Sequence, residues 1–363
     1  MTETEAQMDL RRDCIHYRGD VPCTPHKERG LHCADCPEYL RREGRILLIK
    51  LGAAGDVVRT TPLLHPLGRD YPRHRLTWLT EFPDLVPMSV PDRRRFDATS
   101  VLWARNTAFD LVINLDKDPE ACALATEVLA DRKFGFVLGD DGFCSAVGEA
   151  AEAKILTGVF DDVNQRNSLS YPAEIFGICG YEFAGEEYVL DRPALPASVA
   201  PASGRAVVGL NTGCGGRWTS RLWPEDHWAA LVGLLRKEGL GVMLLGGPEE
   251  DGRNRRLSEA TGALYHGTFP LGEFVGVMDL CDVVVTAVTM AMHLAIGLGK
   301  ELVLFNNIFN PAEFELYGRG EIVTPETSCS CFFAPRCREA KPCMDTLRPE
   351  AVRDAVLRRV DAR

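Results

Sequence analysis

The sequence contains no apolar run long enough to cross a membrane. Its longest apolar runs, such as residues 206–210 and 283–288, have the length of a strand, whereas a membrane helix needs about 20 apolar residues. The opening residues (MTETEAQMDLRRD) are polar and acidic, without the apolar core of a secretory signal or the pattern of a transit peptide. We therefore expect a cytoplasmic protein.

The sequence also lacks the basic excess of a general nucleic-acid binder. Its formal net charge is −11, and such binders need a basic face that displaces counterions. Local basic clusters occur at residues 69–75 and 93–95. Solvated loop charge is the favoured interpretation, and a patch that meets an anionic acceptor or the inner membrane face is the alternative. We expect no nucleic-acid partner.

The length and composition indicate two globular domains. A chain of 363 residues exceeds one ordinary core, and 45% hydrophobic and 26% charged residues are typical of soluble proteins. Residues 191–205 are rich in proline, alanine and serine, which is typical of a linker. The predicted organisation is a cysteine-rich extension (1–44), an N-terminal domain (45–190), the linker (191–205), a C-terminal domain (206–325) and a cysteine-containing tail with a final helix (326–363).

Short apolar runs alternate with helical patterns, which predicts an α/β fold. Residues 46–51 (ILLIKL) read as a strand buried on both faces of a parallel sheet. Such alternation forms right-handed βαβ units, so we expect two doubly wound, Rossmann-like halves that face a cleft. The other predicted strands cover residues 75–80, 110–115, 132–138, 207–211, 242–245, 282–287 and 302–306, and the predicted helices cover 119–129, 224–238, 249–260, 273–280, 289–298 and 349–360.

The turn after the first strand, Gly52-Ala53-Ala54-Gly55-Asp56, combines two glycines with a carboxylate. It lacks the third glycine of the dinucleotide-binding G-x-G-x-x-G pattern, and no clear acidic partner follows about 20 residues later. A carboxylate here would repel a phosphate but could accept a proton from a hydroxyl group, so Asp56 is a candidate general base. A helix-capping role for Asp56 is the alternative.

The turn after residues 207–211 is rich in glycine and carries Arg217 and Arg221. Backbone amides of this turn, which begins at Thr212 and Gly213, would form a diphosphate cradle together with the two guanidinium groups. A flexible surface loop is the alternative interpretation.

Two further turns contribute candidate donor-binding residues. Glu249 and Glu250 follow a strand and could hold ribose hydroxyls, although an acidic first helical turn explains them equally well. Thr289 is a natural helix cap, and His293 on an apolar helix is more often a core histidine than a catalytic one.

Taken in order, these segments resemble glycosyltransferase family 9, the ADP-heptose–lipopolysaccharide heptosyltransferases. The resemblance runs from about residue 46 to residue 345. It rests on ILLIKLGAAGDVVRTTPLL, NTG…RLWPEDHW, LLGGPEE, VVTAVTMAMHLAIGLGK, EFELYGRG and the closing cysteines with CM. The resemblance implies a GT-B fold, a nucleotide diphosphate sugar donor similar to ADP-heptose, a glycan or glycolipid acceptor, an inverting mechanism and no catalytic metal.

The resemblance also implies roles for single residues. Asp56 would be the base, Arg221 would bind phosphate, and one of the two glutamates would bind the ribose. The other residues implied are Thr289, Met290, Ala291 and His293 around the donor, Phe269 beside the adenine, and Gly52, Gly55 and Arg59 in the acceptor-side loop. One departure is Val288, where many members carry aspartate. It points to a changed sugar or nucleotide.

The sequence thus predicts an inverting glycosyltransferase that moves a sugar, with heptose as one candidate, onto a cell-surface glycan or lipopolysaccharide-type acceptor. Two alternatives stay open. A non-catalytic, metal-binding scaffold with a transferase-like shell is motivated by Val288 and the clustered cysteines, and a nucleotide-sugar epimerase has a similar architecture.

The 13 cysteines are unevenly distributed. One group near the start comprises Cys14, Cys23, Cys33 and Cys36, and a looser group near the end comprises Cys329, Cys331, Cys337 and Cys343. Clustered cysteines in a reducing compartment indicate metal or redox chemistry. Structural zinc is a candidate for one or both groups, and an iron–sulfur cluster and plain reduced thiols are the alternatives. No cofactor is expected for catalysis.

Overall fold

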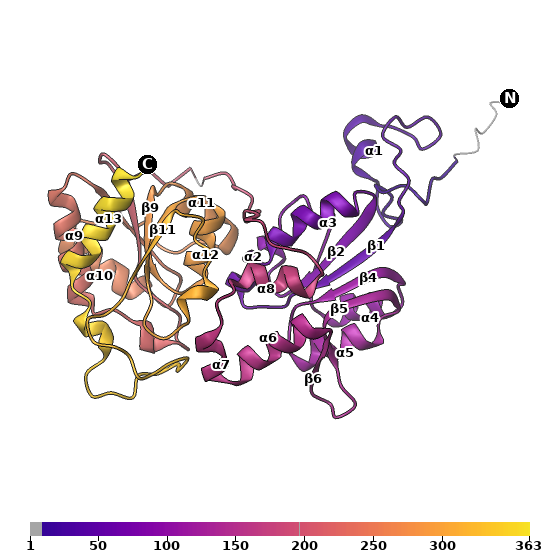
Figure 1. The fold of residues 1–363 in the computed structure, drawn as a ribbon. Coiled ribbons are helices and arrows are strands. Elements are labelled where there is room, and N and C mark those ends of the chain that lie inside the picture. The colour runs from indigo at the N-terminus through magenta and orange to yellow at the C-terminus, as the bar shows by residue number, and fades with distance from the viewer. Residues whose placement is uncertain (1–8, 196) are drawn as a thin grey trace.

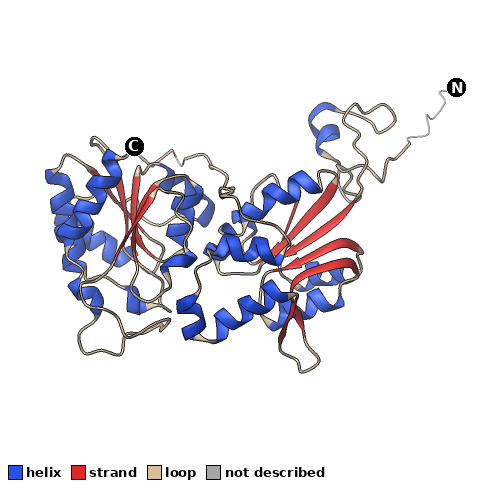
Figure 2. Cartoon of the chain, in the orientation of Figure 1, coloured by secondary structure: helices blue, strands red, loops and turns tan. Residues whose placement is uncertain are grey.

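The chain folds into two α/β halves that lie side by side (Figure 1). A computed structural model describes residues 9–195 and 197–363. Residues 1–8, which contribute to the expectation about location and to the predicted extension, lie outside the described residues, as does Pro196 of the predicted linker. Each half is built on its own sheet, against which helices pack (Figure 2).

The N-terminal half contains a six-stranded sheet in the order β3-β2-β1-β4-β5-β6. All neighbouring strands are parallel except β5 and β6, which are antiparallel. The strands are β1 (Gly44–Ile49), β2 (His74–Thr80), β3 (Asp92–Arg95), β4 (Phe109–Asn114), β5 (Ala130–Leu138) and β6 (Cys144–Val147). The helices are α2 (Ala54–Val58), α3 (Leu64–Asp70), α4 (Ala98–Arg105), α5 (Pro119–Glu127), α6 (Glu149–Val159), α7 (Asp161–Arg166) and α8 (Tyr171–Ile178), with short 3-10 turns at Thr61–Leu63 and Pro83–Leu85.

The C-terminal half contains a parallel five-stranded sheet in the order β11-β10-β9-β7-β8. The strands are β7 (Val207–Asn211), β8 (Gly241–Leu245), β9 (Val283–Ala287), β10 (Glu301–Phe305) and β11 (Gly320–Val323). The helices are α9 (Glu225–Lys237), α10 (Asp251–Thr261), α11 (Leu271–Asp279), α12 (Met290–Gly297) and α13 (Pro349–Asp361), with 3-10 turns at Thr219–Arg221, Pro311–Glu313 and Cys343–Thr346. Helix α13 packs against this half, so the end of the chain contributes to its core.

All the predicted strands are confirmed, and β1, β4, β7, β8, β9 and β10 are largely apolar runs buried in a parallel sheet, whereas β2 and β5 are buried only in part. The edge strand β3 has the sequence DRRR, and its apolar content is too low for any pattern to reveal it. The basic cluster 93–95 therefore lies in a sheet, and the interpretation as loop charge was wrong for it. Arg94 lies over the ring of Trp103 at 3.8 Å and forms an ion pair with Asp92.

The extension before β1 is tied to the N-terminal half at the amino ends of its strands. It contains the short helix α1 (Thr24–Arg29) and otherwise irregular backbone. Arg75 Nη1 in β2 donates a hydrogen bond of 2.8 Å to the carbonyl oxygen of Tyr17. Figure 1 shows the extension at the side of the N-terminal half that faces away from the C-terminal half.

The two halves share an apolar core across their junction. A continuous cluster of buried side chains includes Val57 and Val58 of α2 as well as Leu294 and Ala295 of α12. Polar contacts add to it, since Asn310 Nδ2 donates to the carbonyl oxygens of two residues of the α7 region at 2.6 and 2.7 Å. Within the described residues, no helix combines the length and the apolar character that crossing a bilayer would require.

Candidate active site

The first loop of the site joins β1 to α2 and carries Asp56 on the opening turn of the helix. Asp56 Oδ2 accepts a hydrogen bond of 3.1 Å from the backbone N–H of Ala53. The carboxylate thus satisfies an amide at the helix start, as a capping residue does. Its side chain is still 30% exposed. A capping contact and access for a ligand therefore coexist at this residue.

Two cations flank the carboxylate of Asp56. Arg59 Nη2 lies 2.9 Å from Oδ1, and Lys50 Nζ lies 4.0 Å from Oδ2. Burial alone would raise the pKa of Asp56, but Arg59 and Lys50 outweigh it and hold this pKa below the ordinary 3.8. The carboxylate is therefore ionised at neutral pH and able to accept a proton.

Arg59, predicted for the acceptor-side loop, is fixed in place by an aromatic ring. Its guanidinium carbon lies 3.6 Å from the centre of the Tyr171 ring, which belongs to α8. Burial tends to lower the pKa of Arg59, whereas Asp56 and Tyr171 raise it, and the net direction is upward. Arg59 therefore remains charged and keeps its ion pair with Asp56.

His293 of the C-terminal half reaches the same loop. A Cβ atom placed on Gly55 would lie 2.5 Å from His293 Cδ2, so the glycine allows α12 to approach α2 closely. Tyr188 stacks on the imidazole at an interplanar angle of 17°, with its hydroxyl 3.5 Å from Nδ1. Burial and the charge of Arg59 lower the pKa of His293 to about 3, so the imidazole is neutral.

The start of α12 lies beside the glycine-rich turn of β7. Thr289 caps the helix, with its Oγ1 accepting from the N–H of Ala291 at 3.1 Å. The buried Asn211 Nδ2 donates to Thr286 Oγ1 at 3.0 Å and to the carbonyl oxygen of Gly213 at 3.1 Å. Met290 is half-buried in the first turn of this helix, next to the half-buried Val288. Thr286 Oγ1 lies 3.1 Å from Thr289 Oγ1, so these contacts connect the α12 start to the predicted diphosphate cradle.

Arg221, the residue predicted to bind phosphate, is a buried cation. It is 7% exposed, and it forms no ion pair with a carboxylate within residues 9–195 and 197–363. Nη2 donates to the carbonyl oxygen of Cys214 at 3.2 Å, while Nε has no hydrogen-bond partner there. The rings of Trp218 and Phe309 lie 5.5 and 5.3 Å from the guanidinium carbon. Burial lowers the pKa of Arg221 to about 10, which leaves it charged at neutral pH.

Other predicted donor residues surround the same turn and differ in their exposure and hydrogen bonding. Arg217 is exposed, with its guanidinium carbon 5.6 Å from the Trp218 ring centre. Glu250 lies against Gly213 and accepts from the N–H of Gly247 at 2.9 Å, whereas Glu249 is exposed near Gly216.

Two predicted donor residues face the protein interior instead. The Thr212 hydroxyl donates to Asn254 Oδ1 at 2.6 Å, so its side chain is engaged within the fold. Phe269 is half-buried and packs against the shared core. Their roles, like those of the other site residues, stay predictions.

Sequence reasoning missed the groups that hold Asp56 from neighbouring elements. Asp116 Oδ2 accepts from Lys50 Nζ at 3.1 Å and from the N–H groups of Leu51 and Gly52 at 2.9 and 3.3 Å. The position of Asp116 just after a buried strand was the available signal, because carboxyl ends of parallel strands share one edge.

The two cysteine groups lie in different surroundings. Cys14, Cys23, Cys33 and Cys36 line one small cavity of about 30 Å³, together with His16 and His32. In the other group, Cys331 Sγ lies 4.0 Å from Cys337 Sγ, and the N–H of Cys331 lies 3.3 Å from Cys329 Sγ. In the described part of the chain, no three histidine, cysteine or acidic side chains are arranged as a ready metal site. The metal prediction stays a prediction.

The second cysteine group belongs to a loop that braces the Arg221 turn. Ser220 Oγ donates to the carbonyl oxygen of Ala334 at 2.7 Å, and the Trp218 ring packs on Phe333 at 5.5 Å. Asn307 Nδ2 donates to the carbonyl oxygen of Ser220 at 2.9 Å and approaches Cys343 Sγ at 3.3 Å. The geometry of this turn therefore depends on the cysteine loop.

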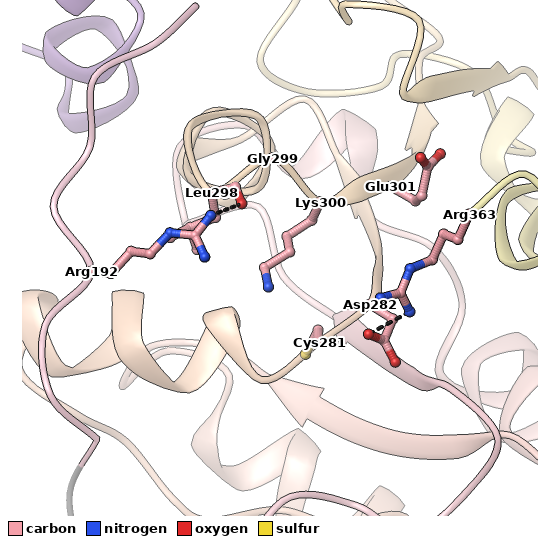
Figure 3. A pocket seen from close by; sticks show the side chains of 8 residues that line it. All are labelled: Arg192, Cys281, Asp282, Leu298, Gly299, Lys300, Glu301 and Arg363. Carbon is pink, nitrogen blue, oxygen red and sulfur yellow. Dashed lines mark hydrogen bonds and ion pairs between the residues drawn. The ribbon is translucent and has the colours of Figure 1, made fainter.

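A hollow of about 380 Å³ lies elsewhere on the C-terminal half (Figure 3). It opens at the amino ends of β9 and β10, away from the loops described above. Its cations are already engaged, since Arg363 pairs with Asp282 and Lys300 Nζ lies 2.8 Å from Asp279 Oδ1. Compensated charge leaves little to attract a phosphate, so this hollow is not the candidate site.

Comparison with known proteins agrees with this arrangement. The model of glycosyltransferase family 9 (heptosyltransferase) matches residues 104–339. Lipopolysaccharide heptosyltransferase 1 of Escherichia coli O18:K1:H7 is 23% identical over 306 residues, covering 77% of this chain and 90% of the relative.

Solved structures share the fold at low sequence identity. The E. coli heptosyltransferase WaaC with ADP aligns with a TM-score of 0.62 and 17% identity, covering 87% of this chain and 99% of that chain. The iron-containing dodecameric glycosyltransferase TibC from enterotoxigenic E. coli H10407 aligns with a TM-score of 0.55 and 13% identity, covering 89% and 80%.

The chain belongs to glycosyltransferase family 9, since the family model spans more than half of it. The two doubly wound halves are those of the GT-B fold, and the predicted fold class is confirmed. The protein is a heptosyltransferase-like glycosyltransferase.

Proposed function

We propose that the protein transfers a sugar from a nucleoside diphosphate sugar to a hydroxyl group of a glycan or glycolipid acceptor, with inversion at the anomeric carbon. One observation carries the proposal. Asp56 is an ionised, partly exposed carboxylate at the junction of the halves, and α12 links it to the turn that carries the buried Arg221, which forms no ion pair with any described residue.

The chemistry divides between the two sides of this junction. Asp56 accepts the proton of the acceptor hydroxyl while the acceptor oxygen bonds to the anomeric carbon. The bond from that carbon to the diphosphate oxygen breaks, and the oxygen keeps the electron pair. Arg221 and the amides of the glycine-rich turn stabilise the negative charge on the departing diphosphate. Base and leaving group act on opposite faces of the sugar, which produces inversion.

The donor is proposed to resemble ADP-heptose. A relative is named lipopolysaccharide heptosyltransferase 1, and a solved neighbour is described with ADP, which supports an adenine nucleotide and a lipopolysaccharide-type acceptor. Val288 stands where the resemblance calls for aspartate, so the sugar contacts next to Thr289 differ in this chain. A panel of ADP-linked sugars would show which one is used.

We further propose a cytoplasmic enzyme that uses no catalytic metal and binds no nucleic acid. The net charge of −11 supports the last point. Contact with the inner membrane face would bring the enzyme to a glycolipid acceptor. The basic clusters do not favour that contact, because Arg75 and Arg94 lie within ion-pair distance of Asp92.

The test of the proposal is Asp56→Asn. The amide oxygen can still accept from the N–H of Ala53, so a purely capping role would leave transfer intact. As a general base Asp56 contributes about 10²–10⁴-fold, and we expect a loss of kcat of that size with donor affinity unchanged. Product formation and donor binding by calorimetry measure the two quantities.

Asp97→Asn is the matched control, because Asp97 caps α4 through the N–H of Ser100 at 2.8 Å and lies outside the site. Full activity in Asp56→Asn would refute the proposal. Conversion of the donor without any acceptor would indicate an epimerase, and failure to bind any nucleotide sugar would indicate a scaffold.

A further inference from the structure

The loop that carries Asp56 is held from the next strand by one buried carboxylate. Asp116 is 6% exposed and lies beyond the end of β4. Its Oδ2 accepts hydrogen bonds from the backbone N–H groups of Leu51 and Gly52, at 2.9 and 3.3 Å. These residues form the turn between β1 and α2. Asp116 therefore determines where α2, and with it Asp56, begins.

Asp116 is itself rigidly placed. Its N–H donates to Asn114 Oδ1 at 3.0 Å, and Asn114 Nδ2 donates to the carbonyl oxygen of Phe136 at 2.8 Å. Asn114 is fully buried in the sheet. Buried polar groups with all partners in place fix a single geometry. These hydrogen bonds fix Asp116 relative to the sheet, and Asp116 in turn fixes the loop between β1 and α2.

The same carboxylate also engages the cation that faces the base. Lys50 Nζ lies 3.1 Å from Asp116 Oδ2 and 4.0 Å from Asp56 Oδ2. Lys50 is 6% exposed, so these carboxylates rather than water balance its charge. The shorter distance goes to Asp116, and Asp56 is left with Arg59 as its close ion-pair partner.

We propose that Asp116 is a positioning residue for the transfer reaction, an inference that rests on the proposed role of Asp56. Asp116 holds the 50–52 turn and keeps the ammonium group of Lys50 from closing onto Asp56. Asp56 therefore retains an accessible oxygen and enough basicity to take the proton of the acceptor. The charged and titratable groups around the two carboxylates are Lys50, Arg59, Asp118, Cys122, Cys144, Tyr171, Tyr188 and His293.

The first variant is Asp116→Asn, which keeps an oxygen acceptor for the two amides and removes the charge. Among the described residues Asp56 is then the remaining carboxylate within 4.0 Å of Lys50 Nζ, and the base is weakened. We expect kcat to fall about 10-fold with the donor KM within about twofold, because a weaker base affects the chemical step and not ground-state binding.

The second variant adds Lys50→Gln to Asp116→Asn. Removal of the Lys50 cation restores the basicity of Asp56, so we expect kcat to recover to within about threefold of the wild type. If Asp116 acts only through stability, the second substitution deepens the defect instead. That result, or a kcat of Asp116→Asn equal to the wild type, would overturn the proposal.

Asp110→Asn is the control, because Asp110 Oδ2 accepts from the N–H of Arg45 at 2.7 Å at the opposite end of the same strand pair. Its kcat should equal that of the wild type.

Should Asp116→Asn not fold, Lys50→Gln alone provides the test. Loss of the cation raises the pKa of Asp56, so the acid limb of kcat/KM must move to higher pH by about one unit. An unmoved limb contradicts the proposal.

The experiments distinguish a failure of the positioning role of Asp116 from a failure of the proposed function. Loss of transfer in Asp56→Asn together with wild-type kinetics in Asp116→Asn refutes only the positioning role. Full activity in Asp56→Asn refutes both.

Discussion

The two sides of the candidate site balance their charges differently. On the N-terminal side Asp56 has Arg59 and Lys50 as partners, and Asp116 engages Lys50 in turn. On the C-terminal side no described carboxylate pairs with the buried Arg221. A buried cation without a partner is costly, so its retention indicates a ligand that supplies the negative charge. In the proposed reaction the charge of the acceptor side is balanced within the protein, whereas the diphosphate of the donor would balance the charge of Arg221.

The largest effect expected from this contrast is at Arg221. Arg221→Gln removes the buried charge proposed to bind the diphosphate and leaves only the exposed Arg217 in that turn, and we expect kcat/KM to fall about 10²–10³-fold. Stability should hold or rise, because no described carboxylate compensates the buried cation, and its hydrogen bond to the carbonyl oxygen of Cys214 offsets only part of the cost of burying the charge. Steady-state kinetics and thermal unfolding measure the two effects.

Arg221→Lys is the conservative partner variant and should keep part of the activity. Arg192→Gln is the matched control, because Arg192 donates to the carbonyl oxygen of Leu298 at 2.9 Å in the hollow of Figure 3, away from the site. A marked loss of stability in Arg221→Gln would contradict the comparison, because it would mean that the protein itself compensates this charge.

An intermediate effect is expected where the two sides touch. Gly55→Ala places a methyl group 2.5 Å from His293 Cδ2, so α2 and α12 must separate. A displacement of this kind moves the base relative to the donor, and we expect kcat/KM to fall about 10-fold. Kinetic assays of purified variants provide the measurement.

Gly68→Ala is the matched control for this substitution. Nothing lies within 4 Å of a Cβ atom at Gly68, which is in α3. Wild-type kinetics in Gly55→Ala would show that the contact between the helices is not needed for the reaction.

The smallest kinetic effects are expected from the cysteine groups. If each group holds a structural metal, replacing Cys33 and Cys36 by serine, or Cys331 and Cys337 by serine, should each remove one metal equivalent per chain. Only the second pair should raise the donor KM, by about threefold, since its loop braces the Arg221 turn. Elemental analysis and kinetics of both variants measure this.

Cys179→Ala provides the control for the cysteine pairs, because Cys179 is a buried thiol in the core of the N-terminal half. Wild-type protein purified without any bound metal, and unaffected by either pair of substitutions, would leave reduced thiols as the interpretation. A raised donor KM after replacement of Cys33 and Cys36 would contradict the prediction that only the second cysteine group supports the Arg221 turn.

Local patterns predicted the central strands but missed the short edge strands β3, β6 and β11, and they did not identify every partner in the site. The apolar run 46–49 predicts β1 because burial on both faces requires apolar side chains throughout. The charged β3 shows no such signal, because it is an edge strand that sequence pattern alone cannot distinguish from a loop. The glycines and Asp56 mark the loop itself. Nothing near Asp56 in sequence identifies Asp116, which is separated from Leu51 by 65 positions.

The sequence by itself determined two alternating α/β halves, the acidic turn after the first strand and the arginine-bearing turn of the second half. These features depend on residue types within a few positions of one another. Only the tertiary structure decided that Lys50 pairs with Asp116, that His293 rests on Gly55, and that Arg221 has no carboxylate partner among the described residues. The physical reason is that charge balance and close contact depend on distances in space, which a linear pattern does not specify.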